Sequence, residues 1–386
     1  MREKITSITF ILLLALSFLF VVVLPKDERA SEKENRPLAE MPKVSLENIF
    51  FGSFTTDYET YLTDKVGFRS YFVDLGTKLD KLKGIEKEES EKVVTLASGG
   101  KLVLSNGKIM EVFKANKDAE REYISALNKL SEKLGCEKYI MLAPTQLEFD
   151  ESEYRHYADS QKETIANIYG GLKGFKTVNI YDSLKENKED YIYFKTDHHW
   201  TQRGAYLAYE CLMEAVGDKA TPLEDLKHEK LSGFLGYLYN QANEPTYSKY
   251  ADDIEYFMGN ENYTIQAKGP DADGNIVSYQ PKIYSLPDPS APALYSIFMG
   301  GDHAFAKIET NNKNEKTLLV IKDSYANALL PLLTENYEEI LVIDPRSYYG
   351  KISDLKAEYD IDELLIVNYV FSTTFTDYIG AINNLL

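Results

Sequence analysis

Hydrophobic and polar residues change their spacing several times along this chain of 386 residues. The first change follows an uncharged run from Ile5 to Pro25, made mostly of Ile, Leu, Phe and Val. At helical rise such a run spans roughly 30 Å, the thickness of the hydrocarbon layer of a bilayer. Arg2 and Lys4 precede it, and no small-residue cleavage motif follows, which favours an uncleaved anchor over the alternative of a cleaved signal peptide. We therefore expect residues 1–26 to be a single-pass cell-membrane anchor, with the rest of the chain extracytoplasmic.

The next segments predict a linker and small local elements. Residues 27–48 are rich in Lys, Glu, Asp, Pro and Ser, which is typical of a linker. Apolar residues recur at helical spacing over residues 56–83 and predict one or two amphipathic helices. Short β-type runs over residues 92–113 are divided by Gly99-Gly100 and Asn106-Gly107, which are hairpin-turn signals.

From residue 118 onward, helical periodicity alternates with short apolar runs. Helices are predicted over residues 118–134, 161–172 and 202–216, and strands over residues 138–143, 177–181 and 191–194. Asp118 is the expected N-cap of the first of these helices. Residues 226–296 break the rhythm with many Tyr, Asn, Gly and Pro residues, and we interpret them as an insertion or cap. Aromatic residues there, such as Tyr237, either stack on sugars or cover the core of the insertion.

The last ninety residues give the clearest pattern. Strands are predicted over residues 317–322, 339–344 and 363–367, and helices over residues 326–333 and 352–359. Continuously apolar strands in this β-α-β-α-β order are typical of a parallel sheet buried on both faces. We predict one α/β domain over residues 49–386, a parallel sheet sandwiched by helices. Ligands of such sheets bind beyond the carboxyl ends of the strands.

Charge and cysteine usage exclude several classes of function. The formal net charge is −18, from 61 acidic and 43 basic residues, and a surface of that sign repels phosphate backbones, so we expect no nucleic-acid partner. Cys136 and Cys211 are the two cysteines, and their spacing fits no structural zinc site. We expect two free thiols, although one disulfide stays possible in an oxidising compartment.

A serine stands where the first of the three C-terminal strands ends. Lys322-Asp323-Ser324-Tyr325 follows that strand and opens a helix. The N-terminus of a helix offers free N–H groups and a dipole that stabilise an oxyanion, which suits a nucleophilic serine. The alternative is that Asp323 or Ser324 is merely the N-cap.

A base for that serine is available in a second motif. The chain has five histidines, and His198 and His199 are adjacent, directly after Asp197. An Asp two positions before a His can curl back to hold the imidazole and fix its tautomer, which makes His199 the base and Asp197 its orienting partner. The three residues could instead bind a metal or be structural polar residues of a loop. Because further ligands at fitting positions are not visible, we expect neither metal nor cofactor.

The segment Thr196–Ala205 (TDHHWTQRGA) closely resembles the DHHW protein family, which is named for this tetrapeptide. Further segments fit the family in the same order, at residues 34–36, 64–69, 298–303, 322–327 and 343–346. The family is similar to SGNH-hydrolase-like proteins, of flavodoxin-like fold, that acetylate alginate and other exported polysaccharides. The resemblance implies that Asp197 and His199 form the dyad and that Ser324 is the nucleophile.

The resemblance and the positions of neighbouring residues at the strand ends suggest further roles. Besides the backbone N–H of Ser324, the predicted oxyanion donors are Asn368, where SGNH enzymes place an oxyanion Asn, and Gly301. The predicted substrate-binding residues are His198, Trp200 and Arg346. His198 could also compete with His199 as the base, and Arg346 could simply pair with carboxylates.

Three functions follow from these expectations. The first is O-acetylation of a cell-envelope or exported polysaccharide, with acetyl groups supplied by a membrane-bound O-acyltransferase partner. The second is a carbohydrate esterase that uses the same triad with water as the acceptor. The third is a non-catalytic polysaccharide-binding or scaffold protein.

Overall fold

The computed structural model describes residues 30–31, 36–37, 58, 61, 91–96, 98–270, 275–287 and 293–386. The chain divides into two compact units, residues 1–89 and 90–386. In the first unit, β1 (Ala30–Ser31) pairs antiparallel with β2 (Arg36–Pro37), and Tyr58 and Tyr61 are helical. The predicted anchor and most of the predicted linker and amphipathic helices lie outside the described residues. Within the described ranges, no helix is long and apolar enough to cross a membrane.

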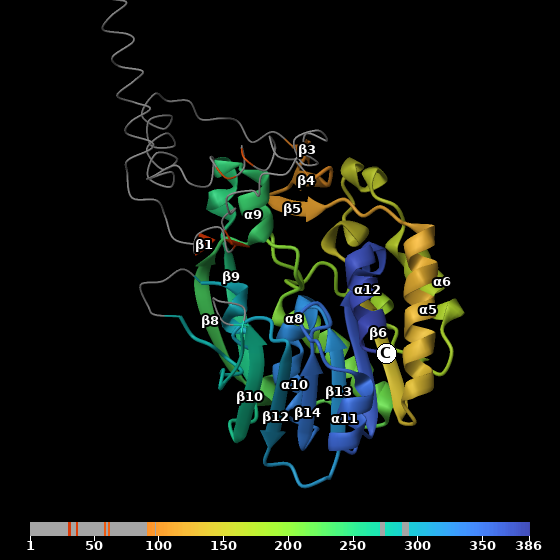
Figure 1. Ribbon diagram of the computed structural model, residues 1–386. Coiled ribbons are helices and arrows are strands. Elements are labelled where there is room, and N and C mark those ends of the chain that lie inside the picture. Colours follow the sequence, from red (N-terminus) through yellow and green to blue (C-terminus); the bar gives the residue numbers. More distant parts are fainter. Residues whose placement is uncertain are drawn as a thin grey trace, which may run out of the picture. The chain divides into compact units, whose positions relative to one another are not determined.

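A mixed sheet forms the centre of the second unit (Figure 1). Its order is β11-β10-β12-β14-β13-β15-β6-β7. The strands are β6 (Glu137–Ala143), β7 (Lys176–Thr177), β10 (Tyr263–Pro270), β11 (Ile276–Tyr279), β12 (Phe305–Thr310), β13 (Thr317–Lys322), β14 (Glu339–Ile343) and β15 (Glu363–Tyr369). The strands from β14 to β7 are parallel, as predicted, whereas β12, β10 and β11 extend the sheet in antiparallel fashion. The predicted parallel sheet is therefore present, but as part of a larger mixed sheet.

The antiparallel strands also change the interpretation of residues 226–296. Strands β10 and β11 come from this segment but belong to the main sheet, so only part of it is an insertion. The other pair, β8 (Lys227–Phe234) and β9 (Asp252–Met258), forms a separate antiparallel sheet. β11 is exposed at every residue, which explains why it gave no apolar run.

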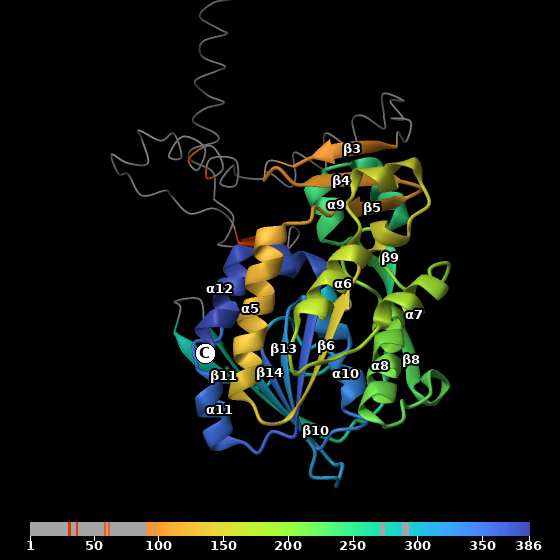
Figure 2. The same cartoon turned by 90° about the vertical axis from the view of Figure 1, so that its right-hand side faces the viewer.

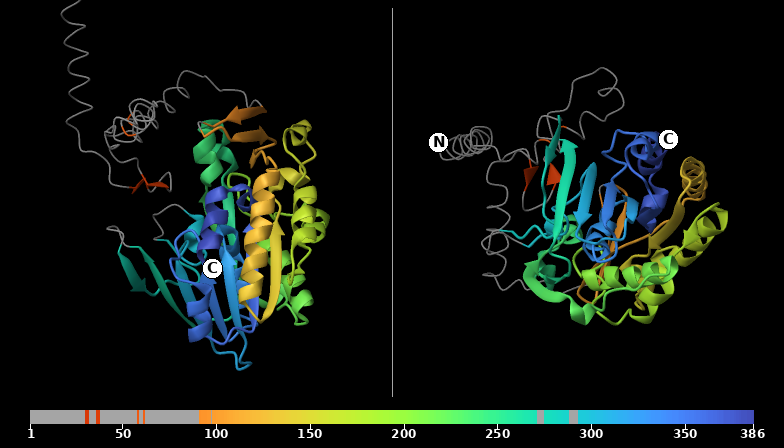
Figure 3. Two further views of the ribbon diagram at one scale, coloured as in Figure 1. Left: turned by 45° about the vertical axis from the view of Figure 1, so that its right-hand side comes forward. Right: turned by 90° about the horizontal axis from the view of Figure 1, so that it is seen from below.

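Helices cover both faces of the main sheet (Figures 2 and 3). On one face lie α5 (Lys117–Lys133), α6 (Gln161–Gly171), α11 (Ile352–Glu358) and α12 (Thr376–Asn384). On the other lie α7 (Ile180–Glu186), α8 (Gln202–Val216) and α10 (Leu330–Leu333). Side chains of a strand alternate between these two cores: in β13, Leu319 and Ile321 pack with the first group, and Leu318 and Val320 with the second.

Several local predictions need correction. The N-cap of α5 is Asn116, not Asp118, because the Asn116 side chain accepts hydrogen bonds from the first turn. The strand predicted over residues 177–181 is limited to β7, since α7 begins at Ile180. The strand predicted over residues 191–194 is a single bridge between Tyr193 and Trp200. Cys136 and Cys211 are free.

The predicted hairpins form a small sheet of β3 (Lys92–Thr95), β4 (Lys101–Ser105) and β5 (Lys108–Glu111). It packs against α9 (Tyr237–Ala242), as Figures 1 and 2 show. The Ile109 N–H donates a hydrogen bond of 2.7 Å to the Lys195 carbonyl, which ties β5 to the loop that carries the DHHW tetrapeptide.

Candidate active site

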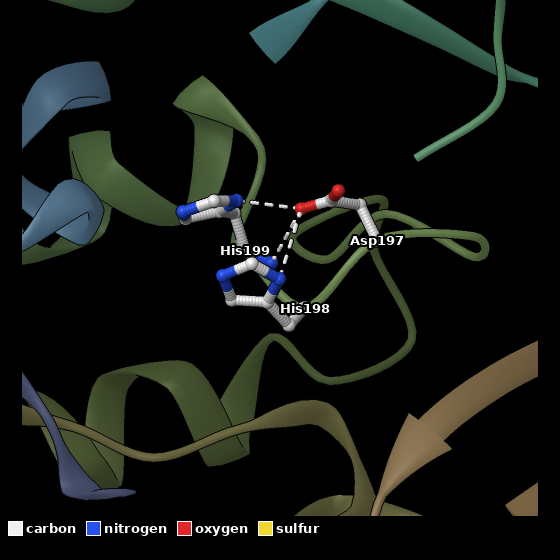
Figure 4. A group of neighbouring side chains, drawn as sticks. All are labelled: Asp197, His198 and His199. Atoms are coloured by element: carbon white, nitrogen blue, oxygen red, sulfur yellow. Dashed lines mark hydrogen bonds and ion pairs between the residues drawn. The ribbon is translucent and has the colours of Figure 1, made fainter. Parts of the chain in front are cut away.

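Asp197, His199 and Ser324 are joined by a continuous line of hydrogen bonds. Asp197 Oδ1 lies 2.5 Å from Nδ1 of His199 and accepts the backbone N–H of His199 at 3.0 Å (Figure 4). On the other side of the ring, Nε2 of His199 lies 2.8 Å from Ser324 Oγ. With its Nδ1 proton directed at a carboxylate, His199 presents an unprotonated Nε2 to the serine hydroxyl. The structure thus brings together the three residues predicted as the triad.

Asp197 is held as a buried anion. Its second oxygen, Oδ2, accepts the Tyr237 N–H at 2.7 Å. Burial alone raises the pKa of this carboxyl, but the adjacent His199 and His198 and the hydrogen bonds outweigh burial and hold the pKa well below its usual range. Asp197 therefore carries a full negative charge with which to stabilise an imidazolium.

Asp252 anchors the loop that presents these residues. This fully buried carboxylate accepts the backbone N–H groups of Lys195 and Thr196, both at 2.9 Å, and the hydroxyls of Thr196 at 2.6 Å and Tyr191 at 2.7 Å. The Thr196 hydroxyl in turn accepts the N–H of Gly236 at 3.1 Å. Sequence analysis missed Asp252, because nothing in its surroundings marks it as a partner of a loop 56 positions earlier.

Asp323, rather than Ser324, caps the short 3-10 turn Ser324–Ala328 that follows β13. One oxygen of Asp323 accepts the Tyr325 N–H at 3.0 Å, and the other accepts the Tyr369 N–H at 2.9 Å and the Ser372 hydroxyl at 2.7 Å. Burial raises the pKa of Asp323 to about 6, although these donors oppose the rise. Because Asp323 caps the turn, the hydroxyl of Ser324 is left to bond His199. In the described part of the chain the N–H of Ser324 also has no protein acceptor, so it can donate to an oxyanion.

A partly buried charge network adjoins the turn Ser324–Ala328, called the serine turn below: Lys322 and Asp344 are buried, whereas Asp302 and Arg346 are partly exposed. The fully buried Lys322 bonds Asp302 and the side chain of Asn327, and Asn327 also donates to Asp302 at 2.9 Å. Arg346 donates to Asp302 at 2.8 Å and to Asp344 at 2.9 Å. Arg346 therefore pairs with two carboxylates, which was the alternative expectation for this residue. The prediction that it binds substrate is not supported.

The structure does not direct the other predicted oxyanion donors at the site. Asn368 is fully buried, and its amide donates to Tyr378, to the Val367 carbonyl at 2.8 Å and to Asp323 at 3.2 Å. The N–H of Gly301 donates to the Phe298 carbonyl at 3.1 Å, within a tight turn where Gly301 has a φ of 104°. Both predictions are corrected, because these donors already have acceptors elsewhere.

The prediction that Trp200 binds substrate is not supported, because its side chain has no exposed surface. Its indole N–H donates to the Tyr325 carbonyl at 2.8 Å. Tyr295, which sequence analysis missed for lack of any motif around it, stacks on His199 with centroids 3.7 Å apart. Its hydroxyl donates to the Ser324 carbonyl at 3.1 Å. Two aromatic residues thus fix the backbone of the serine turn.

His198 lies beside His199, the predicted base. Its ring centroid lies 3.9 Å from that of His199, its Nδ1 lies 3.7 Å from Asp197 Oδ1, and its side chain is 17% exposed (Figure 4). Burial lowers the pKa of His198, and the neighbouring His199 lowers it further. A neutral, partly accessible His198 is consistent with the prediction that it binds substrate.

Asp197, His198 and His199 also form a group that could hold a metal ion. Their ligand atoms lie within 4.8 Å of one another. However, both ring nitrogens of His199 are already engaged, one by Asp197 and the other by Ser324. A metal bound there would have to displace one of these partners.

Comparisons with known proteins show the family of this chain and structures that share its fold. The family model for the DHHW protein matches residues 90–343. The chain is similar to a solved DHHW family protein from Eubacterium siraeum, with 29% identity, a TM-score of 0.67, and coverage of 76% of this chain and 98% of that chain. It shares its fold with Bacillus cereus PatB1, with 23% identity, a TM-score of 0.61, and coverage of 72% of this chain and 99% of that chain. A structure of Bacillus cereus PatB1 with a sulfonyl adduct also shares the fold, with 21% identity, a TM-score of 0.61, and coverage of 72% of this chain and 97% of that chain. No curated protein matches the chain.

Proposed function

The chain belongs to the DHHW protein family, and from this premise we propose that it is a serine acyl-transfer enzyme that O-acetylates a polysaccharide. The observation that carries the proposal is the unbroken hydrogen-bonded line from Asp197 through His199 to Ser324. Such a line activates a hydroxyl that is otherwise a weak nucleophile near neutral pH.

The first half of the reaction acylates the serine. Nε2 of His199 takes the proton of Ser324 Oγ as that oxygen attacks the carbonyl carbon of an acetyl donor. Asp197 stabilises the imidazolium, and the N–H of Ser324 donates to the oxyanion of the tetrahedral intermediate. The bond to the leaving group then breaks, the leaving group takes the proton from His199, and acetyl-Ser324 remains.

The second half of the reaction releases the acetyl group. A sugar hydroxyl attacks acetyl-Ser324 in a transferase, whereas water does so in an esterase, and both use the same three residues. We favour the transferase because the uncharged run Ile5–Pro25 suits a membrane anchor. An anchored, extracytoplasmic enzyme can receive acetyl groups from a membrane-bound O-acyltransferase partner and pass them to a cell-envelope or exported polysaccharide.

Mass spectrometry of the full-length protein tests the proposal. After incubation with p-nitrophenyl acetate, a peptide that contains Ser324 should carry one acetyl group. Ser324→Ala should lose the adduct, whereas Ser353→Ala, a change of an exposed serine on α11, should keep it. A sulfonyl fluoride should block the same serine, given that PatB1 is known with a sulfonyl adduct.

The products distinguish the remaining functions. Acetylated oligosaccharide marks a transferase, and free acetate alone marks an esterase. A scaffold protein would bind glycan equally well as wild type and as Ser324→Ala, with no ester turnover in either. That last result would overturn the enzymatic proposal.

A further inference from the structure

Two buried polar atoms near the triad have no hydrogen-bond partner in the described part of the chain. They are Oε2 of Glu111 and Nδ1 of His198. The nearest carboxylate oxygen to Nδ1 of His198 is Asp197 Oδ1 at 3.7 Å, too far for a hydrogen bond. Leaving a buried polar atom without a partner destabilises the fold, so such atoms beside the proposed triad indicate a place where a ligand supplies the partner.

The fold brings Glu111 to this place through β5. Glu111 is the last residue of β5, and Ile109, two positions earlier on the same strand, donates its N–H to Lys195 at 2.7 Å. Side chains two apart on a strand point to the same side. The Ile109 side chain packs with Leu238 and Ala242 of α9, so the Glu111 side chain faces α9, whose Tyr237 ring meets His198. Consistent with this, His198 and Asp197 both affect the pKa of Glu111, which burial raises.

Aromatic side chains line the same place. The ring of His198 meets that of Tyr237 edge-on, with ring centroids 5.5 Å apart, and its centroid lies 6.0 Å from that of Tyr369. Tyr369 in turn meets Phe375 edge-on, with centroids 6.3 Å apart. Tyr237 is 41% exposed and Phe375 is 46% exposed, so both can be reached from solvent. Aromatic rings beside carboxylate and imidazole groups match a sugar, which has an apolar C–H face and a polar edge of hydroxyls.

We propose that Glu111 and His198, with Tyr237 and Phe375 at the rim, form the subsite for the acceptor sugar, an inference that rests on the proposed acyl transfer. Glu111 Oε2 accepts a hydrogen bond from one hydroxyl of the sugar and so aims a second hydroxyl at acetyl-Ser324. That second oxygen bonds to the acetyl carbon and passes its proton to Nε2 of His199. The bond from the acetyl carbon to Ser324 Oγ breaks, and His199 returns the proton to Oγ.

The charge of the site narrows the class of sugar. Asp197 is held as an anion, and Arg346 is neutralised by Asp302 and Asp344. The chain as a whole carries a formal charge of −18. A glycan made of uronic acids would be repelled, so the subsite favours a neutral sugar.

The experiment measures how acetyl-Ser324 divides its acetyl group between a sugar and water. Full-length protein is supplied with p-nitrophenyl acetate and either cellotetraose, a neutral sugar, or tetragalacturonate, an acidic one. Wild type should prefer cellotetraose. Glu111→Ala should lower the ratio of transfer to hydrolysis by several-fold, up to about tenfold, the loss expected for one hydrogen bond, and Glu111→Gln should lower it less. Glu122→Gln, an exposed site on α5, is the matched control and should stay within about twofold of wild type.

The surface position of Phe375 gives an independent variant that leaves the core intact. Phe375→Ala should raise the cellotetraose concentration that gives half-maximal transfer by several-fold. A wild-type ratio in Glu111→Ala, or no faster discharge of wild-type acetyl-Ser324 in cellotetraose than in buffer, would overturn the subsite while leaving the acyl-enzyme proposal standing. Absence of any adduct on Ser324 would overturn both.

Discussion

The phenol ring of Tyr295 lies flat on the imidazole of His199, with centroids 3.7 Å apart and planes 6° apart. The hydroxyl of the same tyrosine donates to the carbonyl of Ser324 at 3.1 Å. One side chain thus fixes both the plane of His199, the proposed base, and the backbone of Ser324, the proposed nucleophile. Holding the two reacting groups in one geometry reduces the reorganisation that the reaction needs.

Substitutions of Tyr295 should separate its two contacts. Tyr295→Phe keeps the stack and loses the hydroxyl, so we expect kcat for p-nitrophenyl acetate to fall by only a few-fold. Tyr295→Ala loses both contacts and should lower kcat by roughly 10²-fold. Initial rates and thermal unfolding of both variants check this. Equal rates in Tyr295→Ala and wild type would contradict a positioning role.

Asp197→Asn tests the orienting carboxylate. An amide in place of Asp197 allows the wrong tautomer of His199 and cannot stabilise the imidazolium, so kcat should fall by roughly 10⁴-fold. The folded-state pKa of Asp197 lies below its unfolded value, so the stability that its charge contributes is present above about pH 4 and is lost as pH falls through the folded pKa. Denaturant unfolding below pH 4 should therefore show a smaller loss of stability in Asp197→Asn than in wild type. Parallel losses would contradict the assignment.

How far sequence predicts this fold depends on burial. Strands β13, β14 and β15 gave continuous apolar runs because helices cover both of their faces, and their predicted bounds are close to the observed ones. β11 is an exposed edge strand, and its residues carried no such signal. The direction of β10 and β12 depends on pairing across the sheet with strands distant in sequence, which no local pattern records.

In the site, too, contacts between residues close in sequence could be predicted, whereas the direction of a side chain at a strand end could not. Asp197 and His199 are two residues apart, so their contact is local and could be predicted. For Asn368, the sequence located the end of β15 but not the face: Leu364, Ile366 and Asn368 alternate toward α5 and α12, where Tyr123 and Tyr378 bond the amide. A shift of one residue would have directed the side chain to the other face of the sheet.

Trp200 should affect stability far more than substrate use. Trp200→Phe removes the indole donor to the Tyr325 carbonyl and leaves a small cavity in a fully buried position. We expect a loss of about 2–4 kcal/mol in the free energy of unfolding. The measurement is denaturant unfolding, with KM for the sugar acceptor determined alongside. A rise in KM with unchanged stability would restore the predicted substrate-binding role.

Chelators should leave ester turnover unchanged. The only metal-like group found in the described part of the chain is Asp197, His198 and His199, and the hydrogen bonds of His199 compete with coordination. Rates of p-nitrophenyl acetate hydrolysis after dialysis against excess EDTA check this. A loss of rate that added zinc reverses would establish a metal-dependent mechanism in place of the triad.

Asp323 should make the stability of the domain depend on pH between about 4 and 6. Its pKa rises from an unfolded value near 4 to about 6 on folding, so the folded state binds the proton more tightly. This tighter proton binding contributes up to about 3 kcal/mol to the free energy of unfolding. The contribution is present in full below pH 4 and is lost as pH rises through 6.

Ser372→Ala isolates this contribution of Asp323 from the other groups that titrate in the same window. The Ser372 hydroxyl donates to the carboxylate at 2.7 Å, so its removal should raise the pKa of Asp323 further, by about one unit. The loss of stability should then extend to higher pH in Ser372→Ala than in wild type, as measured by urea unfolding across the pH range. Ser353→Ala, on the exposed surface of α11, should follow the wild-type curve. If the curve of Ser372→Ala merely shifts by a constant at every pH, the hydroxyl does not control the ionisation of Asp323, and the serine turn is capped by a carboxylate whose charge is set elsewhere.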